Sequence, residues 1–397
     1  MAANSHQAGD GSSAKGSIFN DPKVRGYIYQ IVLVGGLVYL VWNIVQNTAH
    51  NLEKQNIASG FGFLDNTAGF LPNQSLIDLS ATSTYAEALL AGLLNTLLIA
   101  VIGIFFATIV GFVMGIARLS NNWVISKMAT VYIEIVRNIP LLLQLFFWYF
   151  AVLRTVPHPK QSLDFGGGFF LNNRGFFMPK PEFGEGSALI LYALIAAVLG
   201  VIIMYRWAKK RQMATGQRFP VFMTGLGMLI GLPLVAYFVA GMPVTYDLPA
   251  LKGFNFAGGM KVIPEFVGLL LALTIYTGAF IAEIVRAGIL AVSHGQTEAS
   301  YALGVKPSHT LRLIIIPQAM RVIIPPLTSQ YLNLTKNSSL AVAIAYPDIV
   351  SVGGTVLNQT GQAIEIIGIW MLVYLSLSLI TSMIMNWYNR SIALVER

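Results

Sequence analysis

Residues 298–317 read EASYALGVKPSHTLRLIIIP. The start of this stretch is polar and turn-forming, and long apolar runs lie on both sides of it. A helix that crosses a bilayer needs about 20 predominantly apolar residues, so this stretch is not suited to spanning lipid. We therefore expect it to lie at one face of a membrane and to contact a partner in the aqueous phase.

The composition predicts an all-α polytopic membrane protein. Of the 397 residues, 55% are hydrophobic and only 11% are charged, whereas soluble globular chains carry roughly 25% charged residues. The absence of cysteine excludes disulfides and thiolate metal sites, and the five histidines offer no ligand set. The net charge of +8 is better explained by basic cytoplasmic loops than by nucleic-acid binding.

Eight apolar runs are candidates for membrane spans. They are residues 27–46, 90–117, 138–153, 187–205, 220–240, 264–288, 312–333 and 365–387. No small-residue cleavage site follows the first run, so it is expected to be a retained helix and not a signal peptide. Residues 340–357 are apolar but broken by Pro347, Gly353 and Gly354, which predicts a partial, re-entrant segment.

The basic loops predict the orientation of the spans. The densest positive cluster is residues 206–211 (RWAKKR), with Arg218 beyond it. Cytoplasmic loops carry an excess of Lys and Arg, so this cluster is expected in the cytoplasm. Counting spans from it places both termini, the 118–137 loop and the 289–311 loop on the same side.

The 154–186 loop departs from this rule. The span count places it outside, together with the mainly acidic 47–89 segment. It nevertheless carries four basic residues beside three acidic ones, namely Arg154, Lys160, Arg174 and Lys180 beside Asp164, Glu182 and Glu185. The departure is mild and does not change the predicted orientation.

Local signals around the opening stretch predict a short helix. Ser293 followed by Gln296 fits a capping box, so a helix is expected to begin near His294. Gly304 suits the left-handed position that ends a helix, and Pro307 suits the first turn of the next. On physical grounds alone, this is an ordinary interfacial connector between two spans.

The spacing of the same stretch resembles the EAA loop of ABC importer permeases. The resemblance rests on residues 298–300 (EAS), on Gly304 six positions after the Glu, and on Ile314 and Pro317. The third motif position is Ser300, where Ala is usual.

Three further stretches resemble the polar amino-acid (HisMQ-type) uptake subfamily of these permeases. They are residues 132–144 (YIEIVRNIPLLLQ), 282–289 (AEIVRAGI) and 336–340 (KNSSL). The first has Asn138-Ile139 where Gly-Thr is commoner.

The resemblance implies a type I permease core of residues 85–388, with an insertion at 154–262 that carries two spans. Residues 27–84 add a helix and a periplasmic loop, and the tails are 1–26 and 389–397. This enlarged layout resembles the larger permease subunit of general L-amino-acid uptake systems.

The implied function is that of the permease subunit of a binding-protein-dependent ABC importer for L-amino acids in the bacterial inner membrane. The expected partners are a cytoplasmic ATPase dimer, a second related permease, a periplasmic amino-acid-binding protein and membrane lipid. The chain has no phosphate loop of the Gly-x-x-x-x-Gly-Lys-Ser/Thr type. We therefore expect no catalysis and no cofactor in this chain, with ATP bound by the partner. The residues implied in coupling are Glu298, Ala299, Ser300, Gly304 and Pro317.

The candidates for the substrate path are less closely tied to a motif. Two identical Glu-Ile-Val-Arg tetrads contain Glu134 with Arg137 and Glu283 with Arg286, at a spacing that lets each pair meet on a helix. They are either paired charges at the cytoplasmic edge of the membrane or contacts for a zwitterionic substrate. The remaining candidates are Gln144, Lys336, Asn337 and Ser338, and Lys336 could instead pair with Asp348.

The main alternative is an ion-coupled secondary amino-acid transporter. In that case Glu283 or Glu134 would bind a proton or a sodium ion, and broken helices are common in such proteins too. A dependence of uptake on ATP would distinguish the two functions.

Overall fold

Long helices arranged in a bundle dominate the computed structural model, which describes residues 22–54 and 59–392. Within these residues, seven helical segments are long and apolar enough to cross a membrane, and the number is eight if one bent helix pair is taken as a single span. This count agrees with the eight predicted spans. The main helices are α1 (Pro22–Lys54), α2 (Tyr85–Arg118), α5 (Ala188–Thr215), α6 (Val221–Val239), α7 (Pro264–Leu290), α10 (Ile316–Asn337) and α12 (Ala363–Ile392). The predicted tails 1–26 and 389–397 lie mostly outside the described residues.

The bent pair corrects the prediction of a loop at 118–137. Most of that range is helix α3 (Trp123–Asn138), which meets the following helical segment at an angle of 107°. Asn122 starts α3, since its side-chain oxygen accepts hydrogen bonds from two backbone N–H groups of the first turn. Pro140 ends it, because the residue before a proline is disfavoured in the helical region.

After the bend the chain continues as α4 (Leu141–Phe146), a π-helical turn (Phe147–Val152) and a short 3₁₀ turn (Leu153–Thr155). The Gln144 side-chain amide donates to the carbonyl oxygens of Val136 at 2.8 Å and Ile139 at 2.9 Å. These carbonyls lie at the end of α3 and have lost their helical partners. Gln144 therefore stabilises the bend itself.

Helix α7 lies at the centre of the bundle. Of its apolar window, 56% is buried, against 28% for α2. The two helices approach closely because small residues face each other, as is common between membrane helices. A Cβ atom added at Gly115 of α2 would lie 2.6 Å from the carbonyl oxygen of Ala282 in α7. Buried aliphatic residues extend the contact, among them Ile99, Leu273 and Ile281.

The 340–357 segment is broken, as predicted, although not by its glycines. A 3₁₀ stretch (Ser338–Ile344) follows α10, and α11 (Ile349–Thr360) begins after Pro347. Both glycines lie within α11, and Gly353 leaves room for the Trp370 indole, which donates to the carbonyl oxygen of Ile349 at 2.9 Å.

Polar side chains of α2 bind the backbone exposed by this break. The Asn95 amide donates to the carbonyl oxygens of Gln74 and Pro347, both at 2.9 Å. Thr96 accepts a hydrogen bond from the backbone N–H of Ile349 at 3.0 Å. The buried Asp348 then caps α11 by accepting from the backbone N–H of Ser351.

The insertion adds β-structure that was not predicted. A four-stranded antiparallel sheet has the order β1 (Leu163–Asp164), β2 (Phe170–Asn172), β3 (Gly175–Met178) and β8 (Met260–Val262). Two ribbons accompany it, β4 (Lys180–Phe183) with β5 (Val244–Asp247), and β6 (Ala250–Lys252) with β7 (Asn255–Ala257). We call this group of strands the β platform.

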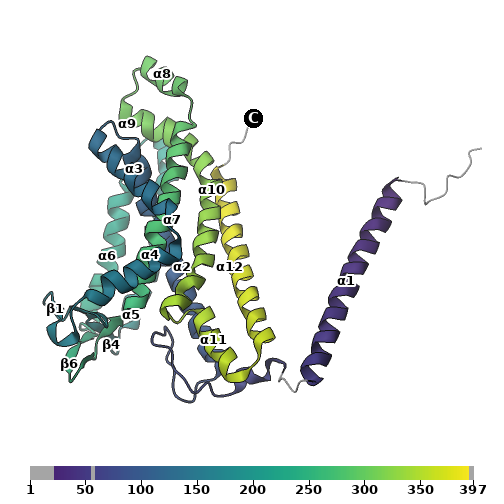
Figure 1. Cartoon of the computed structure of the whole chain (residues 1–397). Coiled ribbons are helices and arrows are strands. Elements are labelled where there is room, and N and C mark those ends of the chain that lie inside the picture. Colours follow the sequence, from purple (N-terminus) through teal and green to yellow (C-terminus); the bar gives the residue numbers. More distant parts are fainter. Residues whose placement is uncertain (1–21, 55–58, 393–397) are drawn as a thin grey trace, which may run out of the picture.

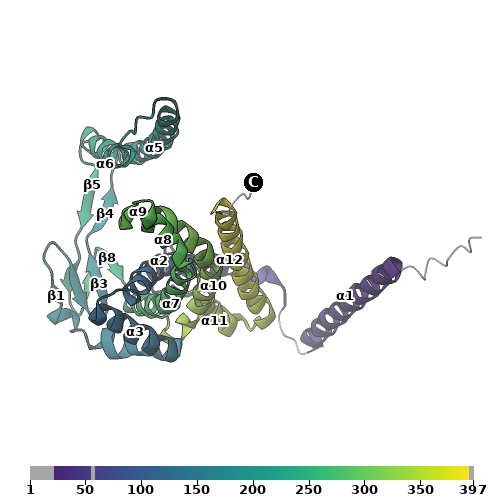
Figure 2. The same cartoon turned by 90° about the horizontal axis from the view of Figure 1, so that it is seen from above.

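The two ends of the bundle carry different structures. The short helix α8 (His294–Ala302) lies at one end, and the β platform and α11 lie at the other (Figure 1). Seen along the bundle, α5 and α6 form a pair set apart from α2, α7 and α10, and the β4–β5 ribbon leads to them (Figure 2).

The close contact of α2 with α7 makes a prediction about packing. Gly115→Ala should lower the melting temperature of the purified transport complex, because the added methyl group overlaps the α7 backbone at a cost of about 1–3 kcal/mol. Gly231→Ala in α6 is the matched control, since its Cβ would meet no atom within 4 Å. Equal melting temperatures for the two variants would show that the contact is looser than described.

Candidate functional site

Helix α8 begins where the sequence predicts, but without the predicted cap. It starts at His294, and the backbone N–H of Gln296 donates to the carbonyl oxygen of Ser293 at 3.0 Å. The Ser293 side chain makes no capping hydrogen bond, so the capping-box prediction is wrong. The backbone turn alone starts the helix.

Gly304 ends α8 in the predicted left-handed conformation. Its φ angle is +71°, and its N–H donates to the carbonyl oxygen of Tyr301 at 2.9 Å. The N–H of Val305 reaches the carbonyl oxygen of Ser300 at 3.0 Å. A Cβ at Gly304 would meet no atom within 4 Å, so the requirement for glycine is conformational and not steric. Pro307 then occupies the first turn of α9 (Pro307–Thr310), as predicted.

Most of α8 projects from the bundle. Glu298 and Ala299 are exposed, and Tyr301 and Leu303 beside them are 51% and 83% exposed. Glu298 makes only a surface contact, with the His294 ring at 3.0 Å. These four residues therefore offer an acidic, a small, an aromatic and an aliphatic side chain to the surrounding medium.

Ser300 is the buried contact that joins α8 to the rest of the chain. It is 2% exposed, and its hydroxyl lies 2.8 Å from that of Thr310, which is 1% exposed. The Ser300 hydroxyl is also 2.9 Å from the carbonyl oxygen of Thr297, and the Thr310 hydroxyl is 3.3 Å from that of Lys306. The shorter distance favours a chain in which Thr310 donates to Ser300 and Ser300 donates to Thr297.

Sequence reasoning missed this pair. In the motif, Ser300 is only a departure from the usual Ala, and no motif includes Thr310. The one indication in the sequence is that Ser300 has a hydroxyl group where the usual Ala has only a methyl group.

Pro317 lies in the first turn of α10, directly after a π-helical turn at Leu311–Ile315. The helix continues from that turn, in which the Ile316 N–H donates to the Leu311 carbonyl oxygen, so the missing N–H of Pro317 removes one hydrogen bond from a continuous helix. A side-chain contact of 3.4 Å between Gln318 and Gln296 also links α10 to α8.

A charged cluster joins α2, α3 and α7 near the same end of the bundle. Glu283 pairs with Arg286 at 2.9 Å, as predicted, and it also pairs with Arg118 at the end of α2. Glu134 pairs with Arg118 at 3.2 Å and not with Arg137, so the second predicted pair is wrong. The Arg137 guanidinium instead lies over the Phe280 ring at 5.1 Å.

Arg118 was not among the predicted residues. It is the last residue of an apolar span, and it sits between two carboxylates because α3 folds back against α2. The span boundary was readable from the sequence, but the direction of α3 was not.

The other substrate-path candidates do not join this cluster through any hydrogen bond or ion pair recorded for the described residues. Gln144 holds the bend between α3 and α4, and the buried Ser338 donates to the carbonyl oxygen of Thr335 at 2.7 Å. Lys336 is exposed and forms no ion pair with Asp348, which caps α11. Asn337 lies partly buried at the end of α10.

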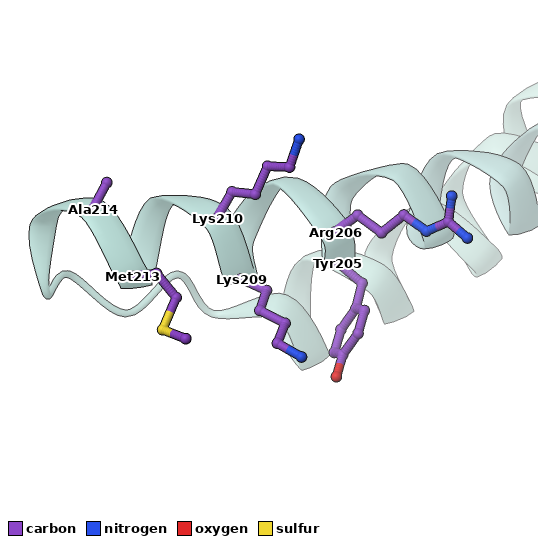
Figure 3. Close-up of a pocket in the computed structure, with 6 residues that line it drawn as sticks. All are labelled: Tyr205, Arg206, Lys209, Lys210, Met213 and Ala214. Atoms are coloured by element: carbon purple, nitrogen blue, oxygen red, sulfur yellow. The ribbon is translucent and has the colours of Figure 1, made fainter. Parts of the chain in front are cut away.

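The pockets described by the structure lie on its surface. One of about 650 Å³ lies on the last turns of α5, and its lining comprises Tyr205, Arg206, Lys209, Lys210, Met213 and Ala214. Figure 3 shows that these side chains do not converge, since Lys210 points away from Lys209 and Met213. Nowhere in residues 22–54 and 59–392 do three His, Cys, Asp or Glu gather as metal ligands would.

Residues from the α5–α6 turn and from the segment after α8 line one further pocket. It is lined by Arg218 from the α5–α6 turn together with Ser308, His309, Arg312 and Leu313. The basic end of α5 and the α8–α9 segment therefore lie at the same end of the bundle.

Comparison with known proteins agrees with this architecture. Residues 210–394 match the family described as "Binding-protein-dependent transport system inner membrane component". The chain is 56% identical to the general L-amino acid transport system permease protein AapQ of Rhizobium johnstonii, over 98% of this chain and 97% of that protein. It is 52% identical to the putative amino-acid ABC transporter permease protein YhdX of Escherichia coli, over 97% and 99%.

A third relative is the glutamate/glutamine/aspartate/asparagine transport system permease protein BztB of Rhodobacter capsulatus, 43% identical over 95% of this chain and 96% of that protein. The helical bundle and these relatives together define a multi-span inner-membrane permease. The chain belongs to the family of amino-acid ABC transporter permeases.

The Ser300–Thr310 contact makes a prediction about the stability of α8. Ser300→Ala or Thr310→Val should increase amide hydrogen exchange of residues 294–304 in the intact complex by about two- to tenfold, the equivalent of one lost hydrogen bond. Ser308→Ala is the control, since that hydroxyl is exposed on the same short segment. Unchanged exchange in both variants would mean that the backbone turn at Gly304 is sufficient to hold α8.

Proposed function

We propose that this permease carries L-amino acids into the cell and couples the movement to ATP hydrolysis by a separate cytoplasmic ATPase dimer. The observation that carries the proposal is α8, a short helix that projects from the bundle end, exposes Glu298 and Ala299, and is anchored through buried Ser300. A helix that is anchored on one side, through Ser300 and through the contact of Gln296 with Gln318, and exposed on the other can bind a groove on a partner and transmit its movement to α7 and α10.

The partners follow from the same proposal. A periplasmic amino-acid-binding protein delivers substrate at the opposite end, and a second related permease completes the path across the membrane. The relatives' printed names, a general L-amino acid system and a glutamate/glutamine/aspartate/asparagine system, support amino acids as the substrate class. ATP is bound by the partner ATPase, and this chain needs no cofactor of its own.

The proposed orientation has α8 and both termini in the cytoplasm. The last turns of α12 lie at the α8 end of the bundle (Figure 1), and the basic turn after α5 lies there too. The excess of Lys and Arg on cytoplasmic loops supports this direction. Residues 85–388 then form the permease domain, with 154–262 as its insertion.

For the charged cluster, we propose a structural role at the cytoplasmic edge of the membrane. Glu283 contacts two arginines, and Arg118 contacts two carboxylates, so the cluster is internally paired. Half-buried pairs of this kind resist removal of one member, because the remaining charge loses its partner. A zwitterionic substrate would have to displace these bonds to bind there.

A transport assay tests the overall proposal. In vesicles containing the complete complex and its binding protein, uptake should require internal ATP and should survive collapse of proton and sodium gradients. Uptake that follows the ion gradient without ATP would favour the secondary transporter.

Changes in α8 should separate hydrolysis from transport. Gly304→Pro removes the N–H that bonds Tyr301 and demands a negative φ, and Glu298→Lys reverses the exposed charge. We expect uptake per ATP hydrolysed to fall by about tenfold, within the usual range of coupling energies, while the complex still assembles.

Gly216→Pro is the matched control for Gly304→Pro. Gly216 ends α5 with a φ of +72° and donates to the carbonyl oxygen of Gln212 at 2.9 Å, so the local strain is the same. Normal transport by Gly304→Pro and Glu298→Lys would contradict the coupling role of α8.

Glu283→Gln tests the role of the charged cluster. A structural role predicts a lower melting temperature of the complex, with an unchanged substrate concentration for half-maximal uptake. A large rise in that concentration at an unchanged melting temperature would instead assign Glu283 to substrate binding.

A further inference from the structure

The β platform exposes an unusual set of side chains for a structure outside the membrane helices. Phe165, Phe183, Tyr246 and Phe254 are between 62% and 76% exposed. Large exposed apolar side chains on a water-facing region mark a surface that a partner covers. The platform lies at the end of the bundle opposite α8 (Figure 1), where it cannot meet an ATPase bound to α8.

A basic cleft opens beside one of these aromatic residues. It has a volume of about 340 Å³, and its lining comprises His158, Pro159, Lys160, Gln161, Arg174 and Phe254. The Lys160 ammonium lies 4.7 Å from the centroid of the Phe254 ring. No acidic residue lines the cleft, and neither Lys160 nor Arg174 forms an ion pair with any residue that the structure describes.

Hydrogen bonds fix the two sides of the cleft before any partner binds. Asn172 is 2% exposed, and its side chain accepts from the backbone N–H of Arg174 at 2.9 Å and donates to the Ser162 hydroxyl at 3.0 Å. The backbone N–H of Asn173 donates to the carbonyl oxygen of Pro157 at 2.9 Å. The Asn173 amide also lies 3.0 Å from the His158 ring. These bonds therefore fix the backbone on both sides of the cleft, from which the two cations extend.

Two of the acidic residues of the platform form no ion pair with these cations, and their carboxylates bind backbone N–H groups instead. Asp164 accepts from the N–H of Gly166 at 2.7 Å, and Asp247 accepts from the N–H of Gly259 at 2.8 Å. Basic residues are also disfavoured as a class in loops on the outer side. We therefore expect an acidic partner to bind a cationic cleft on that side.

We propose that this cleft and its aromatic rim form a docking surface for an acidic patch on the periplasmic amino-acid-binding protein. The inference rests on the proposed function, since it needs α8 to face the cytoplasm. Carboxylates of the partner pair with Lys160 and Arg174, and an apolar side chain packs on Phe254. Aromatic residues and Arg are enriched in protein interfaces. Membrane interfaces favour Trp and Tyr, whereas four of the five exposed aromatic residues here are Phe, with Phe169 added to those above.

Binding-protein-stimulated ATP hydrolysis by the reconstituted complex tests the proposal. Lys160→Glu and Arg174→Glu should each raise the binding-protein concentration for half-maximal stimulation at low salt by about tenfold or more. The effect should shrink at high salt, because screening weakens exposed charges. Phe254→Ser should raise the same concentration at both salt levels. Basal hydrolysis without binding protein should not change, which verifies that each variant is folded.

Lys252→Glu is the matched control, since Lys252 is an exposed cation of the same platform that does not line the cleft. Unchanged half-maximal concentrations for Lys160→Glu, Arg174→Glu and Phe254→Ser, with uptake still dependent on ATP, would overturn the docking surface alone. A wild-type complex without ATP-dependent uptake would overturn the proposed function. Variants that alter only the response to anionic lipid in the vesicles would assign the surface to lipid and also refute the proposal.

Discussion

The close approach of α2 and α7 is the constraint on which the other features depend. Small residues allow the two backbones to meet, and Gly115 lies against the carbonyl oxygen of Ala282. This contact brings the end of α2 beside the end of α7, so that Arg118 reaches Glu283. It also sets the direction in which α7 leaves the bundle and enters α8. A larger side chain at the contact would alter the charged cluster and the position of α8 together.

Several buried polar side chains of the spans form hydrogen bonds with backbone groups. Gln144 binds the carbonyl oxygens released at the α3–α4 bend, and Asn95 and Thr96 bind the backbone at the break before α11. In lipid no water is available for these groups, so each interruption of a helix needs a side chain that replaces the lost partner. This requirement explains buried amides and hydroxyls without assigning them to a substrate.

The sequence predicts those features that depend on hydropathy or on residues close together in the chain. Span count, the start of α8, the left-handed Gly304 and the Glu283–Arg286 pair depend on hydropathy or on neighbours within one turn, and the structure confirms them. Glu134 was paired with the wrong arginine because its partner Arg118 lies in another helix.

The errors in the loops have the same origin. The sequence predicts a loop in place of helix α3 because the polar residues of α3 reduce its hydropathy, although α3 packs Ala129 and Ile133 into the bundle. The strands of the β platform are two to four residues long and pair across an insertion that contains two helices. Strands this short carry little periodic signal, so only their tertiary pairing reveals them.

The chain connects the β platform to α8 through a single helix, α7. Strand β8 of the β platform leads through the buried Ile263 into α7, and α7 leads into α8. The start of α7 is further held by the Tyr149 hydroxyl, which donates to Glu265 at 2.8 Å. A 27-residue helix spans about 40 Å. The β platform and α8 are therefore joined to opposite ends of one centrally packed helix, and the α2–α7 contact holds that helix between them.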